Sequence, residues 1–339
     1  MTTRPQAKVI AHSVNPYGNR LLTFRCRYPK FIHGEFMTHR VLSRNASSSR
    51  AVPTERLIEE ARSDELRAAF VHWGMNQRGM QAAGELDEID MRKAKGWWAH
   101  AAGLAADCAQ GLLDLNTHKQ IVNRLLEPFT HINVLATGTE WDNFFGLRLH
   151  RDAQPEMRAL TEEMWRAFNE SEPVSLRTGE WHLPYADDDQ TRDEVVRYVC
   201  RTTDLTKDVD LALIKVSVAR SARVSYENFE TGKRSTAEKD IEFYSTKLHL
   251  PELAADPEPG APIHASPAEH QGQADELVAR ASLCVGYVNE TLDINNVASS
   301  PVYVDRWMHG HQHGNLTGYR QFRKLLRGEA KAPLPEGYA

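Results

Sequence analysis

The sequence contains no run of about 18 apolar residues, so we expect no transmembrane helix, and no apolar stretch follows its first residues that would indicate a secretory signal. Only four cysteines occur among 339 residues, and no two are spaced Cys-x-x-Cys, which excludes a zinc ribbon or a disulfide scaffold. The 41 basic and 46 acidic residues give a net charge of −5, so a polycation that coats nucleic acid or a membrane is excluded. These absences indicate a reduced, cytoplasmic enzyme with neither a nucleic-acid nor a membrane partner.

With 41% hydrophobic residues, the chain can bury one large core or two smaller ones. Residues 8–32 read as extended structure, with strand-like alternation over 21–28 and a turn signal at 15–19. A helix can start within 31–41.

Residues 55–127 carry apolar residues at helical spacing, including Leu57, Phe70 and Trp73, with further runs at 91–113 and 119–126. Pro128 ends the last run. A helix is predicted over 140–169, kinked or restarted by Pro155. Residues 170–210 read as a connector, and 211–218 as a strand or the start of a helix.

An acid-free segment lies between Phe36 and Thr54, and it contains Arg40, Arg44 and Arg50 interleaved with hydroxyl side chains. Guanidinium groups pair with phosphate oxygens, and small serines let backbone N–H groups approach them. The segment therefore indicates an anion site. The alternative interpretation is a solvated basic loop.

A second segment places Asn143, Leu147 and His150 on one helical face, with Arg148 at its edge. Polar groups at each turn within an aromatic stripe indicate a helix that lines a polar cavity. The alternative is an amphipathic helix whose Arg and Asp residues pair in solvent.

Three alternating histidines, His309, His311 and His313, could in principle bind a metal. No cysteine or carboxylate stands beside them in a known ligand spacing. We therefore predict no metal site and interpret them as a solvated loop or a phosphate contact, with a metal hydrolase as a remote alternative.

Taken together, these segments resemble the flavin-dependent thymidylate synthases. That family has Arg-His-Arg, seven residues, Ser and a further Arg, which Thr38, His39, Arg40, Ser48 and Arg50 match in spacing. The family's downstream helix is matched by Asn143, Arg148 and residues 153–156, and its nucleotide-site arginine by Arg124. The departures are Thr38 for the first Arg, Glu35 for a nucleotide-contacting Gln, Ala46 for an acid, Ala51 for an aromatic residue, Pro155 for a Trp, and Asp152 for a flavin-contacting His, with His150 two residues away.

The order of the blocks is unusual. Segments that lie near the N-terminus in the family, Ala-Arg-Val-Ser and His-x-x-Pro-x-Glu-His, resemble residues 222–225 and 264–270 here. The chain therefore resembles a circularly permuted, divergent member, and we expect these two blocks to pack against residues 24–50. The implied fold is α+β, a sheet flanked by long helices. Residues 1–160 would form the first part of the catalytic domain, with a helical insertion at 55–115. A connector at 161–210 would follow, and residues 211–339 would complete the same domain.

The resemblance implies C5 methylation of a uracil nucleotide, dUMP or UMP, with FAD as cofactor, 5,10-methylenetetrahydrofolate as carbon donor and NADPH as reductant. It implies a homotetramer with sites at subunit junctions. By the same resemblance, FAD is bound by His39, Arg40, Asn45, Asn143, His150, Ser225 and Ser266, and the nucleotide by Glu35, Ser48, Ser49, Arg50, Arg124 and Arg148.

Arg148 is the candidate catalytic group, because none of the four cysteines lies in a recognised block to add to uracil C6. A guanidinium at the uracil edge would stabilise negative charge on the ring. The alternative from another class is a homologue that binds FAD or nucleotide without catalysis.

Overall fold

The computed structural model describes residues 4–63, 70–82, 84–202, 208–224, 234–251, 264–284 and 301–327. At its centre is a five-stranded sheet in the order β3-β4-β2-β1-β5. The strands are β1 Gln6–Val14, β2 Arg20–Pro29, β3 Ser43–Ala46, β4 His131–Gly138 and β5 Val174–Ser175. The strands expected within 8–32 are confirmed as β1 and β2, joined by the predicted turn.

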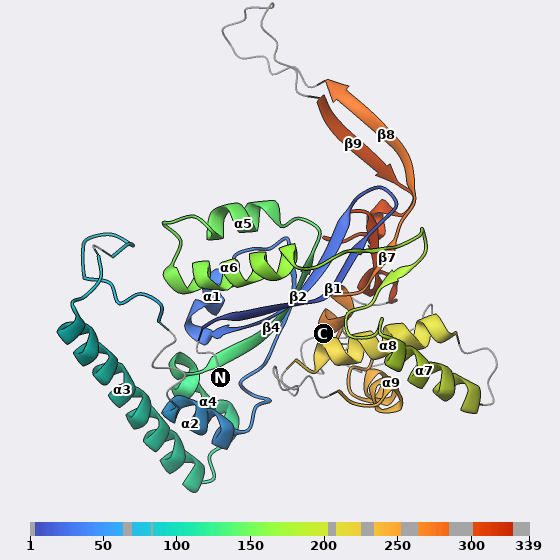
Figure 1. Ribbon diagram of the computed structural model, residues 1–339. Helices are drawn as coiled ribbons and strands as arrows, with labels where there is room; N and C mark the ends of the chain where they lie inside the picture. The colour runs from blue at the N-terminus through green and yellow to red at the C-terminus, as the bar shows by residue number, and fades with distance from the viewer. Residues whose placement is uncertain are drawn as a thin grey trace, which may run out of the picture.

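Strand β2 is buried on both faces because helices or loops cover each side of the sheet. One face places Phe24 and Tyr28 in a core with Phe144 and Met157. These last two residues come from α5 (Asp142–Arg148) and α6 (Pro155–Asn169), which lie over this face (Figure 1). Pro155 begins α6 at its first turn, where proline needs no N–H partner, so the predicted restart is confirmed.

Three helices form a separate group beside the sheet (Figure 1): α2 Thr54–Arg62, α3 Glu88–Asp114 and α4 Lys119–Leu126. Their shared core includes Leu57, Ala106 and Val122. The helical runs predicted at 91–113 and 119–126 are therefore confirmed.

The helical prediction is wrong around Phe70 and Trp73, which lie outside any helix. Phe70 stacks on Phe31 with ring centroids 4.7 Å apart and meets Trp98 edge-on at 4.8 Å. Packing of the Phe70 ring on Phe31, in the turn after β2, and on Trp98 of α3 thus outweighs the local helical pattern.

The C-terminal part contributes α7 Asp189–Arg201, α8 Val209–Ala222 and α9 Ala237–Thr246, whose core includes Val195, Leu213 and Tyr244. Residues 211–218, predicted as a strand or helix start, lie in α8. The segment interpreted as a connector contains α7, whose N-cap is Asp188.

The remaining strands lie at the edge of the body. A three-stranded sheet contains β6 Trp181–His182, β7 Gly272–Ala274 and β10 Tyr319–Gln321, and an antiparallel pair, β8 Leu277–Cys284 and β9 Pro301–Trp307, projects away from it (Figure 1). Short helical turns occur at α1 His33–Phe36, Lys30–Ile32, Glu127–Phe129, Ser266–Glu269, Gly310–Gln312 and Phe322–Leu325. These elements confirm the α+β class. No helix in the described ranges is long and apolar enough to cross a membrane.

A buried chain of hydrogen bonds joins the sheet to the C-terminal part. The His182 ring forms hydrogen bonds with the hydroxyls of Ser13 and Thr23, each at 2.8 Å. The Thr23 hydroxyl is also hydrogen-bonded to that of Thr137, and the Thr137 hydroxyl to His270 Nδ1, again at 2.8 Å. Burial lowers the pKa of both His182 and His270 to about 3. Both histidines are therefore neutral in the folded protein at neutral pH.

We expect acid to destabilise the fold through these histidines. In the unfolded chain they protonate near 6.5, but in the folded protein only near 3, so the unfolded state binds more protons between these values and stability falls as pH drops. Replacing His270 with Asn should reduce the loss of unfolding free energy between pH 6 and pH 4 by about 1–2 kcal/mol. Urea unfolding at several pH values measures this. The exposed-site control His311→Asn should keep the wild-type slope, and an unchanged slope in His270→Asn would refute the assignment.

Candidate active site

Arg148, at the end of α5, is held by three residues from the segment that follows β2. Its Nε donates to His39 Nε2 at 2.8 Å, one terminal nitrogen pairs with the Glu35 carboxylate, and the other lies 3.3 Å from Thr38 Oγ1. The fold thus brings Arg148 to Glu35 and His39, which lie more than 100 residues away in sequence. Thr38, where the family has Arg, becomes a neutral contact.

Local packing fixes this arrangement. Arg44 donates to the carbonyls of Met37 and His39, at 2.7 and 3.0 Å, and so closes the loop that follows α1. The His39 ring meets Phe144 of α5 edge-on at 4.8 Å. Arg44, which the sequence offered as an anion ligand, therefore has a structural role in the described chain.

His39 is neutral and acts as an acceptor. Its pKa is lowered by burial and then by the positive charges of Arg148 and Arg44. Because Nε2 accepts from Arg148, the ring proton must sit on Nδ1. Arg148 is consequently a fixed cation whose orientation is set by a neutral imidazole and a carboxylate.

A second cluster gathers predicted phosphate ligands around an acid. Glu127 accepts from Ser49 at 2.8 Å and pairs with Arg124 and Lys30, each at 2.7 Å. Burial opposes ionisation of Glu127, but the hydrogen bonds from Lys30 and Ser49 and the positive charges of Lys30 and Arg124 lower its pKa. The sequence reading missed Lys30 and Glu127, because neither belongs to a motif and only the fold brings them to Ser49.

The other predicted site residues are mostly exposed. Arg40, Ser48, Arg50 and Asn143 present their side chains to solvent, and the Ser48 hydroxyl accepts from the Arg50 backbone N–H at 3.2 Å. His150 is also exposed and lies 3.5 Å from the Asp152 carboxylate.

The block at 264–270 packs beside β3, and α8, which leads into the block at 222–225, contacts Asn45. Asn45 donates to the carbonyl of Ser221 at 2.6 Å, and Gln321 links Ser43 to the carbonyl of Glu269. Ser266 is exposed in the helical turn of this block. Ser225, a predicted flavin ligand, lies outside the described residues.

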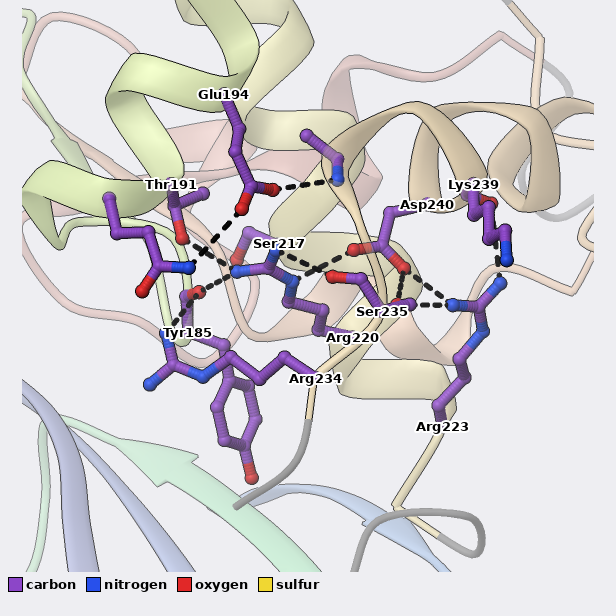
Figure 2. Close-up of polar contacts among 12 residues, drawn as sticks. Tyr185, Thr191, Glu194, Ser217, Arg220, Arg223, Arg234, Ser235, Lys239 and Asp240 are labelled. Atoms are coloured by element: carbon purple, nitrogen blue, oxygen red, sulfur yellow. Dashed lines mark hydrogen bonds and ion pairs between the residues drawn. The ribbon is translucent and has the colours of Figure 1, made fainter.

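Arg223, from the Ala-Arg-Val-Ser block, belongs to a polar network (Figure 2). Asp240, fully buried, accepts from Arg220 Nε at 2.8 Å and from Arg223 at 2.5 Å, and it also accepts from Ser235. Arg220 further donates to the Tyr185 carbonyl at 2.7 Å. The network ties α8, which ends beside Asn45, to α9, so it supports the site rather than forming it.

This network predicts an asymmetry between two aspartates. Asp240→Asn leaves Arg220 buried without its counter-charge and should lower the free energy of unfolding by about 3–5 kcal/mol. Asp188→Asn breaks the exposed pair with Arg234 and should cost at most about 1 kcal/mol, since Asn caps a helix as well as Asp. Urea denaturation of the two variants compares them, and equal costs would contradict the network's role.

The histidine segment has a carboxylate partner that its sequence spacing did not reveal. Asp275 accepts from His309 Nδ1 and from His313 Nε2, each at 2.9 Å. Among the described residues, no group of three or more His, Cys, Asp or Glu side chains is arranged to hold a metal ion. The cluster joins β7 to the 309–313 turn.

The described cysteines lie away from Arg148. Cys26 is buried in the core of β2, and burial raises the pKa of its thiol far above the usual range. Cys108 and Cys200 are exposed on α3 and α7.

Residues 20–174 match the family model for the thymidylate synthase complementing proteins. This match confirms the family resemblance, over a segment that runs from β2 through the His39 motif and α5 to the end of α6. It shows that residues 20–174, less than half of the chain, form a segment similar to the thymidylate synthase complementing proteins. No curated protein matches the chain.

Among solved structures, the UMP/dUMP methylase PolB of Streptomyces cacaoi, bound to 5-Br UMP, is 19% identical, with 49% of this chain and 89% of that chain covered and a TM-score of 0.39. The flavin-dependent thymidylate synthase ThyX of Helicobacter pylori, complexed with FAD and dUMP, is 19% identical over 44% and 67% of the two chains, with a TM-score of 0.30. Because both TM-scores lie below 0.5, the case for function rests on the family match and on the site residues.

Proposed function

We propose that the protein methylates C5 of a uracil nucleotide in a flavin-dependent reaction. The observation that carries the proposal is Arg148, held by Glu35, Thr38 and His39 inside the segment that matches the family. Pairs of donors on a preorganised guanidinium fit the planar edge of a uracil ring.

Arg148 would act by electrostatics. Carbon C5 becomes nucleophilic when negative charge on the ring is stabilised, and a cation held in place needs no reorganisation as that charge develops. The Glu35 carboxylate already accepts from the Arg148 guanidinium. A bound nucleotide would therefore compete with Glu35 for the guanidinium's N–H donors. Glu35 therefore tunes the charge that Arg148 presents to the base.

FAD would be held by donors on the segments that carry the motifs. Arg40, Asn143 and Ser266 expose cationic, amide and hydroxyl groups suited to a dinucleotide's phosphates and polar ring edge. His39, Asn45, His150 and Ser225 would complete the set. Reduced FAD would supply the hydride, NADPH would reduce it, and 5,10-methylenetetrahydrofolate would supply the carbon. The protein would hold the reactants face to face.

The nucleotide phosphate would lie among Ser48, Ser49, Arg50 and Arg124. Lys30 adds a third cation through Glu127, and that carboxylate orients Ser49 and Arg124 while reducing the net positive charge. A phosphate dianion would have to share or displace the Glu127 contacts. The sugar preference, dUMP or UMP, would be set near Glu35 and Ala46, and the assembly would be a homotetramer.

The test is turnover of the purified protein with 5,10-methylenetetrahydrofolate, NADPH and either dUMP or UMP. We expect a yellow protein with about one FAD per subunit, and a methylated product from at least one nucleotide. Visible absorbance measures the flavin, and chromatography detects the product. A colourless protein that also fails to bind added FAD would contradict the proposal, and a yellow protein without turnover would favour a non-catalytic binding homologue.

The mechanism predicts that Arg148 matters and cysteine does not. Arg148→Ala should lower turnover by about 10²-fold or more while the protein stays folded and yellow, and Arg148→Lys should recover little, because an ammonium cannot match two acceptors on a planar edge. A variant with all four cysteines replaced should stay within about tenfold of wild type, allowing for packing loss at Cys26. Steady-state rates compare the variants. A folded cysteine-free variant without activity would overturn the mechanism.

A further inference from the structure

A turn late in the chain, residues 313–318, docks beside the segment that carries the His39 motif. It lies outside residues 20–174, which match the family model. Leu316 is fully buried and packs with Leu21 at the start of β2. The Thr317 N–H donates to the Thr139 hydroxyl, just after β4, at 3.1 Å. The turn is therefore attached to the two central strands from which the site residues emerge.

The side chain of Asn315, in this turn, holds the chain that leads into β3. Its Nδ2 donates to the Val41 carbonyl at 2.8 Å. Its Oδ1 accepts from the Ser43 hydroxyl at 3.1 Å and from Gln321 Nε2 at 2.9 Å. Turning the amide over would set its oxygen against the Val41 carbonyl and its NH₂ group against that of Gln321, so only one orientation satisfies all three contacts.

Gln321 and Gly314 in turn fix Asn315. Gln321 is 2% exposed and donates also to the Glu269 carbonyl at 3.1 Å. Gly314 has a φ of +60°, and a Cβ atom there would lie 2.7 Å from Gln321 Oε1. The turn therefore requires glycine immediately before Asn315, both for its backbone conformation and for the close approach of Gln321.

The backbone is held on both sides of Arg40 as a result. Arg44 donates to the carbonyl of His39 at 3.0 Å, and Asn315 donates to the carbonyl of Val41. Arg40 itself is exposed. Because the carbonyls before and after it each have a fixed donor, the direction in which the Arg40 side chain leaves the backbone is set by Arg44 from within the motif and by Asn315 from the late turn.

We propose that Asn315 is a positioning residue for Arg40, and that it acts through the Val41 carbonyl without touching a ligand. The late turn, which has no counterpart in the matched segment, thereby becomes part of the frame of the site. The inference rests on the proposed function for the identity of the ligand, FAD, whereas the hold on the backbone is independent of it.

The first test measures the backbone of residues 38–42 directly, by hydrogen exchange and mass spectrometry of the full chain without ligand. The amides of Thr38, His39 and Leu42 bond to carbonyls three residues earlier. Asn315→Ala removes the Val41 contact and should speed their exchange by about threefold to tenfold, the effect of one lost hydrogen bond. The matched control Ser43→Ala removes a hydrogen bond to Oδ1 but keeps the Val41 contact, so exchange should stay at the wild-type rate. Wild-type exchange in Asn315→Ala, or equal acceleration in both variants, would overturn the proposal.

The second test is a double-mutant cycle on FAD affinity, measured by quenching of flavin fluorescence. Asn315→Ala should weaken FAD binding by about threefold to tenfold when Arg40 is present and by less than about twofold in an Arg40→Ala background, since its effect passes through Arg40. Ser43→Ala should leave the affinity unchanged. Equal weakening in both backgrounds would overturn the proposal. Failure of the wild-type protein to bind FAD would count against the proposed function, and the exchange measurement alone would then decide the role of Asn315.

Discussion

The site depends on the pairing of β2 with β4 at the centre of the sheet. Eight residue pairs, from Leu22 with Gly138 to Pro29 with His131, align the two strands. This register fixes where the chain leaves the sheet at two points. The His39 motif follows the end of β2, and α5 follows the end of β4. Arg148 and His39 meet because both elements leave the sheet over the face that α6 covers. Thr23 and Thr137, bonded across the same pair, extend the constraint to His270 on the opposite face.

Electrostatics divides the predicted cations into two kinds. Arg44, Arg220 and Arg223 have their donors committed to backbone carbonyls or to Asp240, so they hold loops and helices in place. Arg40 and Arg50 remain at the surface. Arg148 combines both properties, since it is fixed by three side chains at the end of α5 yet remains partly exposed. A guanidinium with that combination suits the stabilisation of charge that develops during a reaction.

Two acidic residues, Glu35 and Glu127, reduce the positive charge that each part of the site presents. Glu35 pairs with Arg148, and Glu127 collects Lys30, Ser49 and Arg124. In the absence of a ligand, Glu35 holds the Arg148 side chain, and Glu127 holds the side chains of Lys30 and Arg124. Binding of an anionic nucleotide then becomes an exchange of partners rather than the filling of an unpaired site.

The sequence by itself determined the elements with strong local signals and the motif residues around Arg148. The alternation of apolar and polar residues predicted β2, and apolar residues at helical spacing predicted α3 and α4. Pro155 predicted the start of α6. The family resemblance also selected Glu35, His39 and Arg148 as candidate site residues, and the fold brings the three side chains into contact. Only the tertiary structure decided that Phe70 and Trp73 leave the helix for an aromatic cluster, that 211–218 is helical, and that Glu127, Asp240 and Asp275 hold distant cations and histidines. Those outcomes depend on contacts between segments far apart in the chain, where burial and charge pairing outweigh local preference and leave no periodic trace in the sequence.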